Sequence, residues 1–480
     1  MTWHAALDQF WPHIAAGFHL LAGALATGHI LLHKRDTRAA TIWIIVIWIL
    51  PAAGPLLYLA LGVNRIRRRA IQLGVHRTLN HPIPDNLGET EPDGVEHLHH
   101  IARVVSRITT QPLSAGNRLE PLISGDEAFP AMLAAIEDAQ RSVTLCTYIF
   151  DNDAVGVKFT AALERAIHRG VAVRVLVDAA GARYSWPPIT TRLRRAHIPA
   201  AKFLPTSLLT PWRAATINLR NHRKLLVVDG QTAFTGGINL RQGNLLAEHP
   251  PSPVQDLHFR VTGPVVTPLQ EAFTNDWAFA TGELLDGPTW FTDPVETGDI
   301  IARVITAGPD ADFETARWTL LAALAEAQKA IKIVTPYFLP DVPLIMALNL
   351  AALRGVRVDI VLPAKNNLPV VQWASEAMWW QVLERGCHLW LTPPPFDHSK
   401  LMIVDGHWVL IGSANWDTRS LRLNFELCVE AYGRSFATQM EAIAARKIAA
   451  ARAVTLAEAD GRHVLIKLRD ATARLFSPYL

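Results

Sequence analysis

Two stretches of the chain carry the same histidine, lysine and aspartate in the same order and spacing. The first motif, "NHRKLLVVDG", spans residues 221–230, and the second motif, "DHSKLMIVDG", spans residues 397–406. Together they supply His222, Lys224, Asp229, His398, Lys400 and Asp405. One H-x-K-x-x-x-x-D pattern arises by chance in about 2% of chains of this size, which is the risk that any short motif carries. A second copy at the equivalent place of a duplicated segment indicates function.

The first motif predicts a β-hairpin. "KLLVV" is strand-like, and Asp-Gly is a strong signal for a two-residue turn. With Asp229-Gly230 at the turn, the numbers of paired residues sum to 459, so His222 faces Gly237 and Asn239 lies diagonally across. His222 and Lys224 are two residues apart and therefore share one face of the strand. The hairpin is predicted to gather a histidine, a lysine and an asparagine.

The second motif predicts the same cluster. Its paired residues sum to 811, so His398 faces Ser413 and Asn415 takes the diagonal place. Asp405, like Asp229, falls at the turn with the wrong parity to face the cluster, which favours a structural role for both aspartates.

Two such clusters suit a substrate with negative charge on oxygen, such as a phosphoryl group. One histidine can attack phosphorus while the other protonates the leaving oxygen. Lysine charge and asparagine amides can hold the equatorial oxygens in the transition state. No dense carboxylate group accompanies either motif, so we expect neither a metal nor a cofactor. A lone histidine is usually a core residue, but that reading does not explain two inward-facing basic residues, twice.

The elements around the motifs alternate between helix and strand, and the alternation is duplicated. Helical periodicity followed by a β-rich apolar run indicates a largely parallel α/β sheet. The first copy has helices at 128–140 and 155–170 and strands at 142–150 and 171–178; the second has helices at 314–328 and 342–355 and strands at 330–338 and 356–363. The spacing of about 180 residues is too long for a solenoid unit and predicts a duplicated α/β domain.

The N-terminal part predicts a two-helix membrane hairpin. Residues 9–32 and 39–64 contain no charged side chain, and each run is long enough to span a hydrocarbon core of about 30 Å. We therefore expect helices at 9–32 and 39–62, although Pro51 and Pro55 are able to break the second. The basic start of a cleaved signal peptide is missing.

Basic residues cluster beside these apolar runs. They signal topology or attract anionic lipid headgroups, and favour a catalytic part on the cytoplasmic side. The residues are Lys34, Arg35, Arg38, Arg65, Arg67, Arg68 and Arg69. The net charge of the 480-residue chain is only +3, so no electrostatic argument for nucleic-acid binding is available. The three cysteines match neither a metal site nor a disulfide framework.

The chain resembles the phospholipase D superfamily and, within it, the bacterial cardiolipin synthases. "KRDTRAATIWIIVIWILPAAGPLLYLALG" resembles the membrane hairpin of that family, and "YIFDNDAVG" and "NLRNHRKLLVVDGQTAFTGGIN" resemble its first half. "TPYFLP", "HSKLMIVDGHWVLIGSANWDTRSLRLNFE" and the terminal "RLFSPYL" resemble its second half. The resemblance implies two duplicated α/β/α sandwich domains with the active site at their interface. The expected parts are a membrane hairpin at 1–75, a linker at 76–115 and domains at 116–288 and 289–480.

The resemblance also implies roles for the candidate residues. His222 is expected to be the nucleophile, forming a phosphatidyl-histidine, and His398 the general acid and then the base. The phosphate is expected to be bound by Lys224, Lys400, Asn239, Asn415 and Ser413. The family places a carboxylate after each motif to orient its histidine, and Asp256 in "VQDLHF" and Glu426 in "LNFE" match those positions.

The implied reaction joins two phosphatidylglycerol molecules into cardiolipin and glycerol at the bacterial cytoplasmic (inner) membrane, in a multi-pass protein. A phospholipase D-type hydrolase or a membrane-anchored nuclease of the same superfamily, or a synthase that uses phosphatidylethanolamine as donor, stays open. So does an inactive lipid-binding protein, although that would not need both histidines. The expected partners are phosphatidylglycerol and membrane lipid rather than nucleic acid, and the sequence leaves the oligomeric state open.

Overall fold

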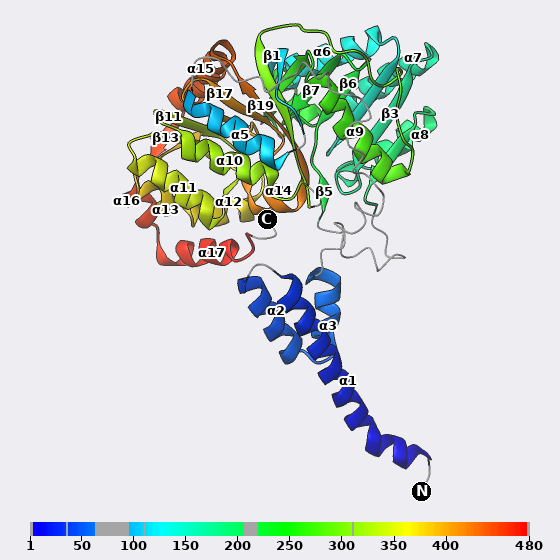
Figure 1. Cartoon of the computed structure of the whole chain (residues 1–480), viewed down its shortest axis with the longest axis vertical. Helices are drawn as coiled ribbons and strands as arrows, with labels where there is room; N and C mark the ends of the chain where they lie inside the picture. The colour runs from blue at the N-terminus through cyan, green and yellow to red at the C-terminus, as the bar shows by residue number, and fades with distance from the viewer. Residues whose placement is uncertain are drawn as a thin grey trace. The chain divides into compact units, whose positions relative to one another are not determined.

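The computed structural model describes residues 3–34, 37–62, 96–109, 111–205, 219–309 and 312–477 (Figure 1). The chain divides into an N-terminal unit, residues 1–69 with 206–218, and a second unit, residues 70–205 with 219–480, which we call the catalytic unit. Each unit is described by itself.

The N-terminal unit contains α1 (Trp3–His33), α2 (Thr37–Ile49), α3 (Ala53–Leu57) and a π-helical turn, η1 (Tyr58–Gly62). Among the described residues, one helical segment, His13–His33, is long and apolar enough to cross a membrane. The continuous second helix expected at 39–62 is wrong, because α2 ends at Ile49 and the chain turns before α3. Pro51 and Pro55 explain the break, since proline lacks the N–H that continues a helix. The basic residues Arg65 to Arg69 lie outside the described part.

One continuous sheet runs through the catalytic unit, and its two halves have the same strand order. The first half runs β1-β9-β7-β6-β2-β3-β4 and the second runs β10-β19-β17-β16-β11-β13-β14, joined where β1 pairs with β10. The strands of the first half, which we call the first repeat, are β1 (Ser114–Ile123), β2 (Ser142–Thr147), β3 (Ala172–Asp178), β4 (Ala200–Phe203), β6 (Leu225–Val228), β7 (Thr232–Gly236) and β9 (Leu257–Thr262). Those of the second repeat are β10 (Ile300–Ala307), β11 (Ala330–Val334), β13 (Arg357–Pro363), β14 (His388–Thr392), β16 (Leu401–Val404), β17 (Trp408–Gly412) and β19 (Asn424–Tyr432), with β20 (Arg452–Val454) beyond β14.

The expectation of a largely parallel sheet is wrong. Along the main path of the sheet, β2-β3-β4 and β11-β13-β14 are parallel and the other pairings are antiparallel; off this path, β5 (Arg220–Asn221) pairs parallel with β19. The helix-strand alternation produces the parallel strands. The two strands of each motif hairpin are antiparallel to each other, and β1, β9, β10 and β19 are antiparallel to their neighbours along the main path. The sheet is therefore mixed.

Helices cover both faces of each half. On β2, Val143 packs with Phe129 of α6 (Ser124–Asp138) and Phe159 of α7 (Ala154–His168), while the neighbouring Thr144 donates to Gln270 of α9 (Val266–Thr281) at 2.8 Å. Since adjacent strand residues point to opposite faces, α9 lies across the sheet from α6 and α7. The second repeat uses α10 (Thr315–Glu326) and α11 (Val342–Leu353) on one face and α15 (Arg434–Ala450) on the other.

The linker expected at 76–115 is only partly a connection. The helix α5 (His99–Ile108) packs on α10, and Leu98, Ile101 and Val105 are fully buried in the core of the second repeat. Arg303 of β10 donates to Ala102 O at 3.0 Å, which fixes α5 further. Residues 96–109 therefore belong to the core of the catalytic unit.

The motif hairpins differ by one residue from the expected register. Leu225 pairs with Thr235 and Val404 pairs with Trp408, so the sums are 460 and 812 rather than 459 and 811. Asp229 and Gly230 both have positive φ, as the turn requires, but one further residue separates the turn from β7. A shift of one residue exchanges the two faces of a strand, so the predicted cross-strand partners of the histidines are wrong.

Shorter elements complete the catalytic unit. They include α8 (Ile189–Arg195), β5 (Arg220–Asn221), β8 (Val254–Gln255), β12 (Phe338–Leu339), α12 (Pro369–Glu376), α13 (Trp379–Leu383), β15 (Phe396–Asp397), β18 (Trp416–Asp417), α14 (Thr418–Arg422), α16 (Leu456–Asp460) and α17 (Val464–Arg474). Two of them, β5 and β15, lead directly into the motif histidines.

Candidate active site

Each motif histidine is held by the backbone of the other repeat. The strand β5 of the first repeat pairs with β19, and β15 of the second pairs with β8. His222 N donates to Phe425 O at 2.9 Å, and His398 N donates to Gln255 O at 2.7 Å. The chain therefore crosses between the repeats just before each histidine, by the same hydrogen-bond pattern in both copies.

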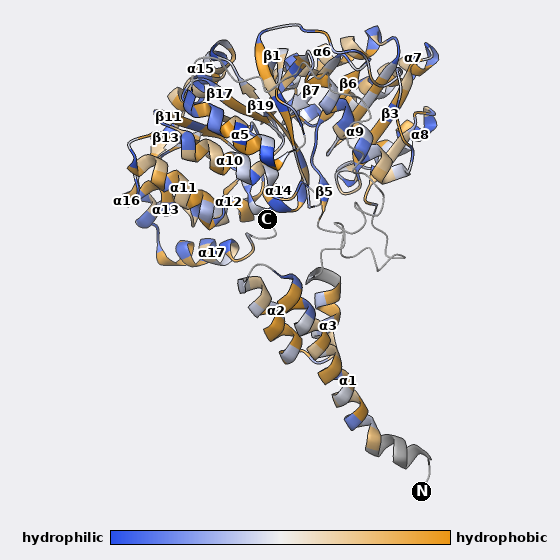
Figure 2. Cartoon of the chain, in the orientation of Figure 1, coloured by the Kyte–Doolittle hydropathy of each residue, from blue (hydrophilic) through white to orange (hydrophobic). Residues whose placement is uncertain are grey.

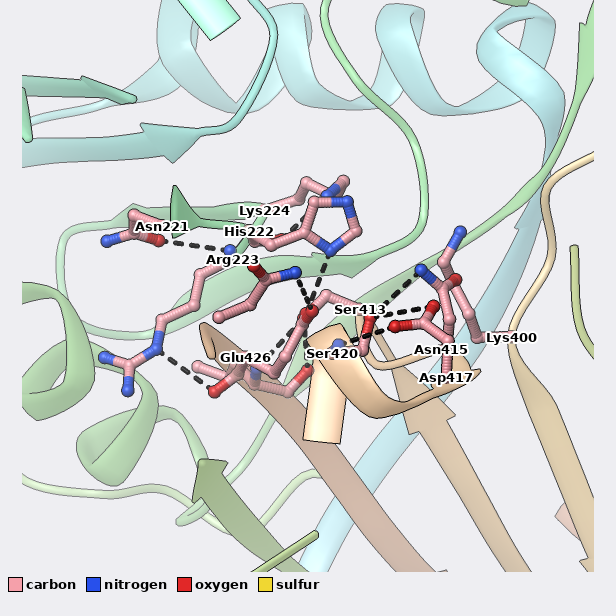
Figure 3. Close-up of polar contacts among 12 residues, drawn as sticks. Asn221, His222, Arg223, Lys224, Lys400, Ser413, Asn415, Asp417, Ser420 and Glu426 are labelled. Carbon is pink, nitrogen blue, oxygen red and sulfur yellow. Dashed lines mark hydrogen bonds and ion pairs between the residues drawn. The ribbon is translucent and has the colours of Figure 1, made fainter. Parts of the chain in front are cut away.

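The carboxylate that contacts each histidine also comes from the opposite repeat. His222 Nδ1 lies 3.0 Å from Glu426 Oε2, and His398 Nδ1 lies 2.7 Å from Asp256 Oδ2 (Figure 3 shows the first pair). The expectation that each carboxylate orients the histidine of its own motif is wrong. Glu426 follows Phe425 and Asp256 follows Gln255, so the backbone pairing across the repeats delivers each carboxylate to the opposite histidine. Neither repeat contains a complete histidine-carboxylate pair.

The two histidines face each other across a narrow gap. Their ring centroids are 6.4 Å apart at an interplanar angle of 82°, and each residue is 7% exposed. With Nδ1–H donating to a carboxylate, Nε2 of each ring remains for chemistry.

A tyrosine lies beside each histidine. Tyr148 is 5.1 Å from His222 and Tyr337 is 6.0 Å from His398, measured between ring centroids, and burial raises the pKa of both phenols. These tyrosines follow the equivalent strands β2 and β11. They were missing from the predicted site, although their recurrence at matching places of the duplication was a usable signal.

Both motif lysines are buried. Lys224 Nζ donates to His222 O at 2.7 Å, whereas Lys400 Nζ contacts His398 O and also lies 2.7 Å from His398 Nδ1. Burial lowers the pKa of Lys224 to about 7 and that of Lys400 to about 8. Each ammonium has three donors, so hydrogen-bonding capacity remains for an anionic ligand.

The pKa values of both histidines and both carboxylates are lowered, but for different reasons. Burial lowers the pKa of His222 and lowers that of His398 to about 4. Burial alone would raise the pKa of Asp256 and Glu426, but the facing lysine and histidine charges and hydrogen bonds hold both below the usual range. At neutral pH each pair therefore combines an ionised carboxylate with a neutral imidazole.

Ser413 was predicted to bind phosphate, and in the structure its hydroxyl contacts a carboxylate of the site. Its hydroxyl donates to Glu426 Oε2 at 2.5 Å and accepts from Leu427 N at 2.9 Å, so it positions the carboxylate. The equivalent residue of the first repeat is Gly237, where an added Cβ would lie 2.1 Å from Asp256 Oδ1. Glu426, which has the longer side chain, thus lies next to a serine, and Asp256, which has the shorter one, lies next to a glycine.

The predicted phosphate-binding asparagines follow β7 and β17. Asn239 Oδ1 accepts from Ile149 N at 3.2 Å, next to Tyr148, which leaves its amide N–H groups for a ligand. Asn415 Nδ2 donates to Ser420 Oγ at 3.1 Å, and Asn415 Oδ1 has no hydrogen-bond partner among the described residues. Figure 3 shows Asn415 with Lys400 and Asp417.

The motif aspartates lie away from the histidines, at the other end of β6 and β16. Asp229 accepts from the backbone N–H groups of residues 140, 141 and 142, and Asp405 accepts from those of residues 328, 329 and 330. His97 Nε2 also lies 2.8 Å from Asp405 Oδ2. Both aspartates fix the loop that enters the central strand, which favours the structural role predicted for them over a catalytic one.

No metal site accompanies this cluster. Within the described ranges, no group of three or more histidine, cysteine, aspartate or glutamate side chains is arranged to hold a metal ion.

A duplicated α/β unit in which two histidine-lysine motifs meet defines a phospholipase D-type protein. The model of the family described as cardiolipin synthase, PLD-like domain, matches residues 132–277 and 320–448, and that described as phospholipase D-nuclease N-terminal matches residues 23–62. The chain belongs to the cardiolipin synthase family of PLD-like proteins.

Curated relatives are similar over their full length. Cardiolipin synthase A of Pseudomonas fluorescens strain SBW25 is 32% identical over 490 residues, with 99% of this chain and 100% of the relative covered. Cardiolipin synthase A of Pseudomonas putida is 31% identical, with both chains fully covered. Among solved structures, phosphatidylserine synthase of Haemophilus influenzae matches 79% of this chain and all of its own with a TM-score of 0.61 at 14% identity, which shows a shared fold.

Proposed function

We propose that the protein is a cardiolipin synthase, a phosphatidyltransferase that converts two phosphatidylglycerol molecules into cardiolipin and glycerol. The observation that carries the proposal is the crossed arrangement of His222 with Glu426 and His398 with Asp256, which leaves two neutral imidazoles facing each other. Family membership and the full-length likeness to curated cardiolipin synthases support the same activity.

In the first step, Nε2 of His222 attacks phosphorus and the bond from phosphorus to the glycerol oxygen breaks. The leaving glycerol takes a proton from His398, and a phosphatidyl-histidine remains. Burial keeps the pKa of His398 at about 4 in the unliganded protein, so a proton has to be gained on substrate binding. Binding of the negatively charged phosphodiester raises the pKa of His398, because a nearby anion favours the protonated imidazole.

In the second step, the hydroxyl of another phosphatidylglycerol attacks the phosphatidyl-histidine. His398, now neutral, takes the hydroxyl proton, and the bond from phosphorus to His222 breaks. Lys224 and Lys400 neutralise the phosphoryl oxygens in both steps, and the amides of Asn239 and Asn415 donate to them.

We propose the finer placement of the parts on the same basis. The apolar helical segment His13–His33 supports a membrane-bound enzyme. We propose that residues 39–62 re-enter or cross the bilayer, that the catalytic unit lies on the cytoplasmic side, and that the repeats extend over residues 116–288 and 289–480 with the active site at their interface.

The test is lipid analysis after purified full-length protein is incubated with phosphatidylglycerol vesicles alone, with the double variant His222→Ala/His398→Ala as control. Cardiolipin and glycerol in equal amounts support the proposal. Phosphatidic acid without cardiolipin would instead identify a hydrolase. Cardiolipin that forms only after phosphatidylethanolamine is added would identify a different donor.

A further inference from the structure

The last helix of the described chain, α17, turns its apolar side chains outward. An ordinary surface helix of a globular protein buries its apolar face against the core. Here the exposed fractions are 60% for Val464, 66% for Leu465 and 59% for Leu468, and they are 75% and 56% for Leu475 and Phe476, which directly follow the helix. The residues that α17 buries are Asp470 and Ala473. This helix therefore exposes apolar side chains and buries a charged one, which is the reverse of the usual arrangement.

The outward residues form one face with a cationic edge. Val464, Leu468 and Leu475 recur at spacings of four and seven, which places them on one side of the helix. Lys467 and Arg474, seven residues apart, run along its border and are exposed. Figure 2 shows hydrophobic and hydrophilic segments together along α17. A solvent-facing apolar face bordered by cations is the pattern of helices that lie in the interface of an anionic bilayer.

The helix α17 is fixed to α12. Arg462, just before α17, donates to Glu376 O at 2.8 Å and pairs with the Glu376 carboxylate at 3.1 Å. The guanidinium of Arg469 lies 4.6 Å from the centroid of the Trp373 ring. Glu376 and Trp373 both belong to α12, so the apolar face of α17 has a defined direction on the second repeat (Figure 1).

From α12, a short path leads to the active site. The loop before α12 contains Asn366, which donates to Pro336 O at 2.8 Å, and Asn367, which accepts from Tyr337 Oη at 2.9 Å. The Tyr337 ring lies 6.0 Å from that of His398. This loop also exposes Leu368. The helix α17 therefore lies at the edge of the sheet where the active site is, one helix and one loop away from a catalytic histidine.

The first repeat exposes a large aromatic side chain at its equivalent edge. Trp186, in the loop after β3, is 91% exposed. In the same loop, Tyr184 lies 6.3 Å from Tyr148, whose ring is 5.1 Å from His222. Tryptophan partitions to the region between lipid headgroups and acyl chains. Both repeats thus expose apolar side chains in loops that contact the active-site tyrosines.

We propose that the outward face of α17 inserts into the surface of an anionic bilayer and, with Trp186 of the first repeat, holds the loops beside the active-site tyrosines against the lipid. The inference rests on the proposed function, since a lipid substrate has to pass from the bilayer to His222 and His398. Lys467 and Arg474 would meet anionic headgroups while Leu465 and Leu468 enter the acyl region. This membrane contact belongs to the catalytic unit itself and is additional to any anchoring by α1.

Site-specific labels test the contact directly in the full-length protein. The three native cysteines are all buried, so a fluorophore can be directed to Leu465→Cys or Leu468→Cys. Leu353→Cys is the matched control, because Leu353 is 67% exposed but ends α11 at the opposite edge of the sheet. In phosphatidylglycerol vesicles we expect nitroxide-bearing lipids to quench the labels on α17 and not the control. Equal quenching at the three positions, or full access of aqueous iodide to the α17 labels, overturns the proposal.

Activity gives a second readout. We expect Leu465→Glu/Leu468→Glu to lower phosphatidyl transfer on long-chain vesicles by roughly tenfold, since moving even one leucine out of an apolar environment costs more than that factor. Transfer with monodisperse short-chain phosphatidylglycerol should be retained, and Leu350→Glu/Leu353→Glu should match wild type on both substrates. Unchanged vesicle activity of the α17 variant overturns the proposal. If the wild type transfers neither substrate, the proposed function fails, while the label measurement still decides the membrane contact.

Discussion

The crossed pairing of histidines and carboxylates predicts an unusual phenotype for Asp256→Asn. Asparagine keeps the shape of the side chain, and its Oδ1 can still accept from Leu257 N, as Asp256 does at 2.8 Å. What is lost is the negative charge beside His398 Nδ1, 2.7 Å away. Although Asp256 lies in the first repeat, we expect its substitution to disable the histidine of the second.

The size of the effect follows from the bond that is removed. A buried hydrogen bond to a charged group contributes about 1.5–3 kcal/mol, which corresponds to about 10- to 150-fold in rate if the bond is needed only when His398 carries a proton. The sign of the pH dependence also follows. Asp256 raises the pKa of His398 against burial and Lys400, so removing its charge lowers that pKa further. Because the acid form of His398 protonates the leaving oxygen, the descending limb of the rate profile should move to lower pH.

The assay compares two leaving groups in single-turnover formation of the phosphatidyl-enzyme. Glycerol needs a proton as it leaves, whereas 4-nitrophenolate does not. Asp256→Asn should therefore be slow with phosphatidylglycerol and close to wild type with a 4-nitrophenyl phosphodiester. The matched variant Glu426→Gln acts on His222, the proposed nucleophile, and should be slow with both substrates.

The opposite result would refute the reasoning. If Asp256→Asn is slow with both leaving groups while Glu426→Gln is rescued by 4-nitrophenolate, either each carboxylate serves the histidine of its own repeat or the roles of the two histidines are exchanged. Trapping the adduct and identifying the modified histidine by mass spectrometry separates these explanations.

The remaining predictions concern the nucleophile, metals, the motif aspartates and the N-terminal unit. His222→Ala should abolish the covalent phosphatidyl-enzyme while His398→Ala slows its formation and breakdown; a labelled adduct on His398 of the native enzyme would reverse this assignment. Activity should survive exhaustive chelation, and complete loss that one added metal restores would show that the lysines are not sufficient. Asp229→Ala and Asp405→Ala should each lower the free energy of unfolding by about 1–3 kcal/mol, measured by denaturant titration, with the activity of the folded fraction retained. The pKa of Asp405 is lowered, so its contribution should be complete above the unfolded-state pKa and be lost as pH falls through the folded-state value; an effect independent of pH would argue against the carboxylate contacts. A protein starting at Glu96 should still cleave short-chain substrate but yield more phosphatidic acid relative to cardiolipin on vesicles, and an unchanged ratio would place the selection against water in the catalytic unit alone.

The sequence allowed the duplicated α/β organisation and the chemistry of the two motifs to be predicted, because both depend on local pattern. Periodicity located α6, α7, α10 and α11, and the Asp-Gly turn located both hairpins. The identity of a phosphoryl-transfer site followed from residue types alone, since histidine and lysine in this spacing have few other uses.

The partners of those residues were not predictable in the same way. The exchange between His222 and Glu426 depends on β5 pairing with a strand 204 residues further along the chain, which no local pattern encodes. The hairpin register depended on a single extra residue after the turn, and one residue was enough to give wrong cross-strand partners. The resemblance implied a phosphate-binding role for Ser413, but no local pattern predicted that its hydroxyl donates to the buried Glu426.

The crossed pairing of each histidine with a carboxylate of the other repeat limits how such a chain can evolve. A protein with one repeat would hold a histidine and a carboxylate that cannot serve each other, so it would be active only as a symmetric dimer that donates each carboxylate across its twofold axis. Fusing two copies makes this association intramolecular and independent of protein concentration. Fusion also allows the two halves of the active site to diverge in sequence, but a change at one residue then requires a change at its neighbour. A side chain at Gly237 would collide with Asp256, whereas Ser413 supports the longer Glu426, so an evolutionary change in either carboxylate has to be accompanied by a change at the residue beside it.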